Sequence, residues 1–200
     1  SIKFLGDGQA SVISFDGALN CEQDCSTRYK QGTDVSLGAT ARFGSRLIGW
    51  KSVCPQGTAQ CTFTVQDDAE VQLESTLDDF PIEITKLGDG SGRVVSAGAG
   101  IDCGGICTAT VSYFTRVSLT AEPEPGTEFA GWSGGCLGGS PVCLVTMTGP
   151  IDVTAYFIPE FVLTVSNQGQ GSGVVRSDPA GLDCDATCDG FFARNARITL

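Results

Sequence analysis

The sequence predicts an all-β protein built as a tandem array of small domains, each stapled by disulfide bonds. Two observations lead to this fold class: the ten cysteines recur at a constant spacing, and short alternating apolar segments are separated by glycine-rich turns. The chain also lacks the 3.6-residue periodicity of amphipathic helices. Each repeat must therefore fold as one small domain with its own core.

The cysteine pattern sets the length of the repeat. Two sets consist of a Cys-x3-Cys pair followed by a Cys-x6-Cys pair, and a third set contains the first pair alone. The sets are displaced by 82 residues from Cys21 to Cys103 and by 81 residues from Cys103 to Cys184. The ten residues are Cys21, Cys25, Cys54, Cys61, Cys103, Cys107, Cys136, Cys143, Cys184 and Cys188.

The segments around the cysteines repeat in the same register. A glycine-rich turn begins each copy, and strand-like segments follow as DVSLGA at 34–39, RVSLTA at 116–121 and RITL at 197–200. This alignment predicts three domains. They are repeat 1 at 1–79, which is diverged and nearly complete, repeat 2 at 80–159, which is complete, and repeat 3 at 160–200, which is truncated in this sequence. We expect the 200 residues to be part of a longer mature protein.

In repeat 2, seven short segments alternate in hydrophobicity as strands do. They are 82–85, 92–96, 108–111, 116–120, 129–132, 143–147 and 151–157. The joins at Phe80-Pro81 and Ile158-Pro159-Glu160 are too short to be flexible tethers. We therefore expect neighbouring domains to stack as an elongated rod.

Composition narrows the classes of partner and of chemistry. Twenty-three acidic and twelve basic residues give a net charge of −11, which repels nucleic acid and anionic membranes. The chain has no histidine, the most common general base and transition-metal ligand. Paired cysteines in this number indicate an oxidising compartment, so we expect a secreted or cell-surface protein. No apolar run is long enough to span a membrane.

The motifs GxGSGxVxS, AGIDCxxxC, VxLTAxPxxGxxFxGWSGxC, CxVTM and VTAxF within residues 82–157 resemble the divergent B-repeat family of bacterial surface proteins, related to the internalin B-repeat. The resemblance implies a small all-β domain, either related to the β-grasp or a small sandwich. It also implies tandem copies in secreted and cell-surface proteins, where they often act as stalks or spacers, and no catalytic residues. Repeat 1 departs from the pattern at Gln9-Ala10, Asn20 and Lys51.

The cysteines are expected to form local disulfides, because a Cys-x3-Cys pair suits a tight turn and a Cys-x6-Cys pair suits a longer hairpin loop. The expected bonds are 21–25, 54–61, 103–107, 136–143 and 184–188. Cross-pairing within a copy, such as Cys103 with Cys136, is the alternative. Repeat 3 favours local pairing, since Cys184 and Cys188 have no second pair within the sequence. A zinc site is disfavoured because the spacing is not Cys-x2-Cys.

Other recurring residues have structural interpretations. The glycine-rich segment at 88–92 is expected to be a hairpin turn, because Asp7 and Asp89 align with Gln170 and no P-loop lysine follows. The residue before each first cysteine, which is Asn20, Asp102 or Asp183, is expected to cap a turn, with calcium binding as the alternative.

The aromatic residues are assigned in the same way. Trp50 and Trp132 each follow a glycine and are expected to be core residues, with a sugar-binding platform as the alternative. Phe114, Phe191 and Phe192 are less regular and are candidates for contacts between domains.

No catalytic constellation is present in the sequence. Ser133 lies among glycines but lacks a strand-to-helix elbow and a histidine. The acidic residues Asp78, Asp79, Glu122, Glu124 and Glu128 are expected to form a solvated edge that discourages strand pairing between molecules. We expect no enzyme activity, no cofactor and no metal site.

The sequence thus predicts a non-catalytic structural or adhesive repeat region of a bacterial surface protein, acting as a stiff stalk or as a subunit of an extracellular fibre. The alternative is a spacer or carbohydrate-binding accessory region of a secreted enzyme. The expected partners are proteins, either neighbouring repeats or copies of the chain, with surface glycans as the alternative. If the chain ended at Leu200, the open edge of repeat 3 would favour donor-strand exchange, although a longer chain is the simpler expectation.

Overall fold

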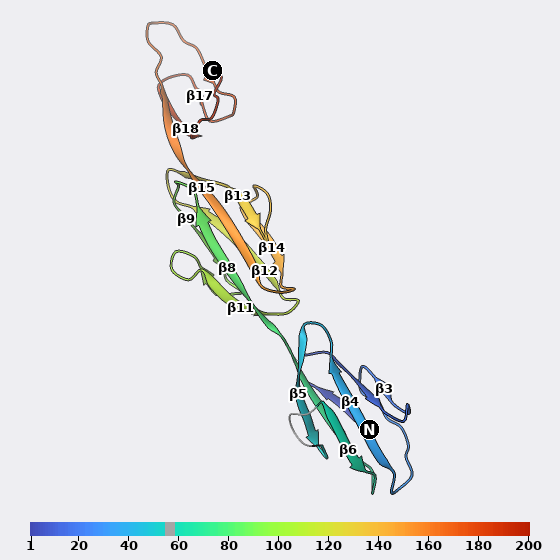
Figure 1. Cartoon of the computed structure of the whole chain (residues 1–200). Helices are drawn as coiled ribbons and strands as arrows, with labels where there is room; N and C mark the ends of the chain where they lie inside the picture. Colours follow the sequence, from blue (N-terminus) through green and yellow to red (C-terminus); the bar gives the residue numbers. More distant parts are fainter. Residues whose placement is uncertain (55–58) are drawn as a thin grey trace. The chain divides into compact units, whose positions relative to one another are not determined.

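A computed structural model describes residues 1–54 and 59–200 as an all-β protein, which confirms the predicted fold class (Figure 1). No helix occurs in this described part of the chain, and hence none that could span a membrane. The chain divides into two compact units. The first comprises Ser1–Phe80, Val111–Thr115 and Met147–Gly149, and the second comprises Pro81–Thr110, Arg116–Thr146 and Pro150–Leu200.

The strands of repeat 1 form two sheets. One has the order β1-β7-β5 and the other has the order β3-β2-β4-β6. The first strand pairs in parallel with the last, and the other pairs within these sheets are antiparallel. The strands are β1 (Ile2–Leu5), β2 (Ala10–Ser14), β3 (Asn20–Cys21), β4 (Asp34–Ala41), β5 (Ser45–Ser52), β6 (Gln60–Thr64) and β7 (Val71–Leu77).

Repeat 2 has the same strand order with one additional strand, β11, and its first and last strands are longer. Its sheets have the orders β11-β8-β15-β13 and β10-β9-β12-β14, and β8 pairs in parallel with β15. The strands are β8 (Asp79–Leu87), β9 (Gly92–Ser96), β10 (Ile101–Asp102), β11 (Thr108–Ser112), β12 (Arg116–Pro123), β13 (Thr127–Gly134), β14 (Val142–Thr146) and β15 (Ile151–Val165). Each of the seven segments predicted for this repeat overlaps one of these strands.

The two repeats bury equivalent residues because their strands alternate in the same phase. In β4 the buried residues are Val35, Leu37 and Ala39, and in β12 they are Val117, Leu119 and Ala121. Strands of both sheets contribute to the core of repeat 1. A small sandwich, one of the two architectures expected, is therefore the arrangement of repeats 1 and 2.

A β-bulge precedes the Gly-Trp pair in both repeats. The register with the last strand shifts between Leu47 and Gly49 and again between Phe129 and Gly131. The glycines have φ angles of 141° and 142°, a conformation that other residues rarely adopt. A bulge places two successive residues on one face of the strand, so both the glycine and the following tryptophan are buried.

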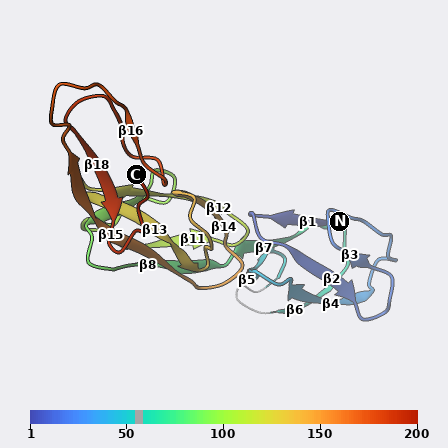
Figure 2. The same cartoon turned by 90° about the horizontal axis from the view of Figure 1, so that it is seen from above.

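The join between repeats 2 and 3 differs from the expected linker. Ile158, Pro159 and Glu160 lie inside β15 (Figure 2). This strand pairs with β8 up to Tyr156 and with β13 up to Pro159, and then with β18 (Cys188–Ala193) from Glu160 to Val165. Pro159 is tolerated because it opposes Thr127 at the end of the β13 ladder, where the next strand partner takes over. The join is therefore not a separate linker, because one strand serves both repeats, and this agrees with the expectation that it is no flexible tether.

Repeat 3 has less regular structure than the other two. Its other elements are β16 (Val175–Arg176) and β17 (Asp183–Cys184), which pair with each other. The segment 197–200, expected to be a strand, forms only the isolated bridge between Asp178 and Thr199. The equivalent strand in repeat 2, β12, is held by neighbours on both sides.

The bulge glycine gives a first testable prediction. Replacing Gly131 by alanine should lower the free energy of unfolding by about 1–3 kcal/mol. Alanine would be strained at the φ angle of this residue, and its Cβ would lie 3.2 Å from the Gly138 backbone oxygen. Urea unfolding followed by tryptophan fluorescence measures this loss. Gly98→Ala is the matched control, since a Cβ there meets nothing within 4 Å, and it should change stability by less than about 0.5 kcal/mol. Equal effects of the two substitutions would contradict this role of the bulge.

Candidate functional site

The cysteines form five local disulfides in the structure: 21–25, 54–61, 103–107, 136–143 and 184–188. The Cα–Cα distances across these bonds range from 4.3 Å at Cys103–Cys107 to 6.2 Å at Cys21–Cys25. Part of the loop closed by Cys54–Cys61 lies outside the described residues. The bonded cysteines are 4 or 7 residues apart in the sequence, so the disulfides hold local geometry and do not connect distant parts of a domain.

Burial separates the disulfides of repeats 1 and 2 from that of repeat 3. In the first two repeats at least one cysteine of each pair is buried, as Cys61, Cys103 and Cys136 illustrate. Cys184 and Cys188 are both partly exposed. A buried sulfur is shielded from reductants by the core, and an exposed one is not.

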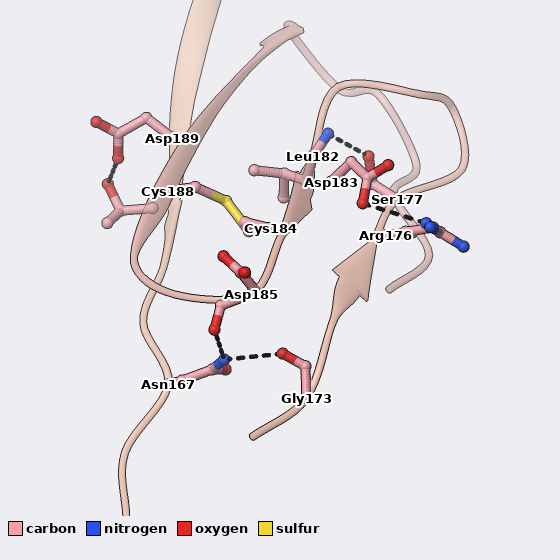
Figure 3. The surroundings of a disulfide bond; sticks show 11 residues. Asn167, Gly173, Arg176, Ser177, Leu182, Asp183, Cys184, Asp185, Cys188 and Asp189 are labelled. Carbon is pink, nitrogen blue, oxygen red and sulfur yellow. Dashed lines mark hydrogen bonds and ion pairs between the residues drawn. A yellow bond between two sulfur atoms is a disulfide. The ribbon is translucent and has the colours of Figure 1, made fainter. Parts of the chain in front are cut away.

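Polar contacts surround the exposed disulfide of repeat 3 (Figure 3). The Asn167 side-chain amide donates to the backbone oxygens of Asp185 and Gly173 at 3.1 and 3.4 Å. Arg176 donates to the Asp183 carboxylate at 3.2 Å, directly before Cys184. Hydrogen bonds at the surface thus support the turn that this disulfide closes.

The two tryptophans lie in the cores of their repeats. Trp50 is 0% exposed and Trp132 is 5% exposed. The Trp132 indole N–H donates to the Ser140 backbone oxygen at 2.8 Å, and its ring lies 4.9 Å from the ring of Phe129. Neither indole ring is accessible for stacking on a sugar.

The glycine-rich turn of repeat 2 packs against the backbone of the last strand. A Cβ on Gly88 would lie 2.1 Å from the Phe157 oxygen, and one on Gly90 would lie 2.6 Å from the Ile158 nitrogen. Gly90 N–H also donates to the Phe157 oxygen at 2.9 Å. Glycine is needed here because two backbones meet, which is a structural reason for the GDG sequence.

The aspartate of this turn has different partners in repeats 1 and 2. Asp7 accepts a hydrogen bond from the Leu77 backbone N–H at 3.2 Å, and this bond together with the Thr76 hydroxyl lowers the pKa of Asp7 below its ordinary value of 3.8. Asp89 instead accepts from Arg194 of repeat 3 at 3.2 Å. Alignment of the repeats does not reveal this second contact, because Arg194 aligns with Tyr113.

The aspartates before the first cysteine pairs face arginines. The Asp102 carboxylate lies 3.8 Å from Arg93, and the Asp183 carboxylate lies 3.2 Å from Arg176. The turn at Cys103–Cys107 is closed by the backbone oxygen of Asp102, which accepts from Ile106 N–H at 2.7 Å. The expected side-chain cap is therefore replaced by a backbone hydrogen bond, and the carboxylate is left for an ion pair.

The remaining acidic residues do not converge on one point. Asp78 pairs with Arg46 at 3.4 Å, Asp79 accepts from the Ser112 hydroxyl at 2.6 Å, and Glu122 pairs with Arg93 at 2.7 Å. The hydrogen bond and the charge of Glu122 raise the pKa of the Arg93 guanidinium. Within residues 1–54 and 59–200 there is no group of three acidic or cysteine side chains that could hold a metal ion.

Repeat 1 contains a cavity of about 670 Å³. Its walls include Leu19, Leu37, Phe63 and the side chain of Tyr29, with Glu70 among the acidic residues at its border. In repeat 2 the residue aligned with Val65 of the lining is Met147, which is completely buried. A core side chain thus occupies the equivalent place in repeat 2, and we assign no ligand to the cavity.

The phenylalanines proposed for interdomain contacts have different environments. Phe192 is buried, and a Cβ on Gly181 would lie 2.7 Å from its ring, so it belongs to the core of repeat 3. Phe191 is exposed, as is Phe114, whose ring lies 5.6 Å from that of Tyr113.

Comparison with known proteins supports the repeat assignment. A family model described as the divergent InlB B-repeat domain matches residues 16–75 and 89–160, which confirms the resemblance stated from the motifs. Comparison with curated proteins finds no match.

Two solved bacterial structures align with this chain at low identity and low TM-score. The Bacillus anthracis TIE protein aligns with 96% of this chain at 10% identity and a TM-score of 0.45, and this chain spans 42% of that protein. The pilus adhesin SpaC from Lactobacillus rhamnosus GG aligns with 79% of this chain at 9% identity and a TM-score of 0.34, and 31% of that protein is covered.

The disulfide pairing is tested by mapping the unreduced protein. Proteolysis followed by mass spectrometry should find each bond within one local pair, and iodoacetamide should add no mass before reduction, because no cysteine of the described chain is free. The reduced protein, which should take up ten alkyl groups, is the control. A peptide joining Cys103 to Cys136 would contradict the local pairing.

Proposed function

Because this chain belongs to the divergent InlB B-repeat family, we propose that it is a non-catalytic repeat region of a secreted or cell-surface bacterial protein and acts there as a stiff stalk. The repeats are those matched at 16–75 and 89–160. Domain boundaries at 79–80 and 159–160 form part of this proposal. The protein partners are neighbouring repeats, and the module that the stalk presents lies outside this region.

The continuity of β15 is the observation that carries the proposal. A flexible linker between domains would allow each domain to rotate independently. In β15, Pro159 is the last residue paired with β13, and Glu160 is the first paired with β18. Because every residue from Ile151 to Val165 is in one strand, rotation between repeats 2 and 3 requires breaking strand hydrogen bonds.

The disulfides support an extracellular location. Structural disulfides persist in oxidising compartments, and domains of about 80 residues have small cores that benefit from them. A net charge of −11 keeps such an array soluble and discourages association between copies through exposed strands.

The buried tryptophans favour a structural region over a carbohydrate-binding one. A sugar platform needs an exposed aromatic ring, whereas Trp50 and Trp132 have 0% and 5% exposure. A spacer within a secreted enzyme would need the same stiffness as a stalk of a surface protein. These two roles differ only in the module that the repeats carry.

Surface location is tested with an antibody raised against the folded repeats. Intact cells of the source bacterium or their culture medium should bind the antibody without permeabilisation, and a cytoplasmic protein serves as the control that appears only after lysis. Signal from the repeats that also requires lysis would contradict the proposed location.

Stiffness of the join is tested by interrupting β15. Inserting six Gly and Ser residues between Ile158 and Pro159 should broaden the distribution of distances between spin labels at exposed Glu124 and Arg197, because the strand no longer connects the two repeats. The same insertion between Gly98 and Ala99, in a turn of repeat 2, should leave the distribution narrow. A distribution equally broad in the unmodified chain would contradict a stiff join.

A further inference from the structure

We propose that the parallel pair formed by the first and last strands of a repeat is a mechanical clamp, which allows the chain to carry tension without unfolding. The biological use of the clamp rests on the proposed stalk function, but its existence depends only on strand geometry. In repeat 2 the pair is β8 with β15, and in repeat 1 it is β1 with β7.

The relative direction of the two strands determines how the pair responds to force. When a chain is pulled at its ends, tension enters repeat 2 at the start of β8 and leaves it along β15 toward Glu160. Because these strands are parallel, they are loaded at opposite ends and must slide past each other. The hydrogen bonds between them then share the load and have to break together.

Strand pairs loaded at the same end behave differently. Their hydrogen bonds open one after another, and each opening needs only the force that breaks a single bond. The same set of contacts therefore gives high resistance in one loading direction and low resistance in the other.

The first and last strands of repeat 2 are arranged to be sheared when the chain is pulled at its ends. Six residue pairs connect β8 to β15, from Ile82 opposite Ile151 to Leu87 opposite Tyr156. On the inner face Ile84, Val153 and Ala155 are buried, so sliding would also expose apolar side chains to water. In repeat 1 only four pairs connect β1 to β7, and we expect its clamp to be weaker.

No disulfide connects the two strands of a clamp, although the backbones of Cys25 and Cys107 are hydrogen-bonded to the first clamp strand at Ile2 and Ile84. Cys103–Cys107 and Cys136–Cys143 close loops of 4 and 7 residue steps between the clamp strands. They shorten the length of chain that is released when a repeat unfolds, but they do not connect β8 to β15. The clamp and the staples are therefore separable by experiment.

The clamp is tested by pulling single molecules of the full 200-residue chain. With handles at Ser1 and Leu200, repeats 1 and 2 are both sheared and should rupture as separate events, with repeat 1 at the lower force. The variant Cys136→Ser with Cys143→Ser identifies the event of repeat 2. Its released length should grow by about 20 Å, which is seven residue steps at ~3.6 Å less the 6.1 Å across the bond.

A second handle position changes only the loading direction in repeat 2. Thr148 is exposed and lies three residues before the start of β15 at Ile151, so pulling between Ser1 and Thr148 loads β8 and β15 at the same end. The force of the repeat 2 event should then fall several-fold, while the repeat 1 event stays unchanged as an internal standard.

Two outcomes overturn the clamp. One is a repeat 2 event at the same force for both handle positions. The other is a repeat 2 event at a lower force with handles at Ser1 and Leu200 than with handles at Ser1 and Thr148. Neither depends on where the protein resides, so an intracellular location would refute the stalk function and leave the clamp standing. A direction-independent force would refute the clamp and leave the surface location standing.

Discussion

The parallel pairing of the first and last strands of a repeat is the constraint on which the rest of the structure depends. Because β8 and β15 point the same way, the chain leaves repeat 2 in the direction in which it entered. The strand that ends one domain can therefore continue as the strand that begins the next, as β15 does at Glu160. An antiparallel first and last strand would send the chain back toward its entry point, and an array would then need linkers.

Other features of the domain adapt the chain to this pairing. The last strand lies between the first strand and the strand that carries the tryptophan, and the bulge before Gly131 turns Trp132 into the core. The glycine turn passes so close to Phe157 that a side chain at Gly88 would collide with the strand. Local disulfides then stabilise turns that a small core leaves weakly held. Repeat 3 has fewer strand pairs, and around its disulfide, polar contacts such as that of Asn167 take the place of core packing.

Much of the fold could be predicted from the sequence, because the length of the repeat and the alternation of apolar and polar residues can be read directly from the order of the residues. The cysteine spacing revealed the repeats, and the alternation of Val117, Leu119 and Ala121 revealed a half-buried strand. Proline at 159 misled the prediction at the join, since a proline is tolerated in a strand where no hydrogen-bond donor is needed. The parallel pairing of β8 with β15, the ion pair of Asp102 with Arg93 and that of Asp89 with Arg194 depend on chain topology and leave no periodic signal.

Small-angle X-ray scattering of the 200-residue chain tests most directly whether shared strands make this array a stalk. A compact protein of this length has a radius of gyration of roughly 16 Å. A stalk, in which β15 continues from repeat 2 into repeat 3, should give a value at least about 1.5 times larger, with a pair-distance distribution that has a long tail. A value near that of a compact protein, with a symmetric distribution, would contradict the stalk.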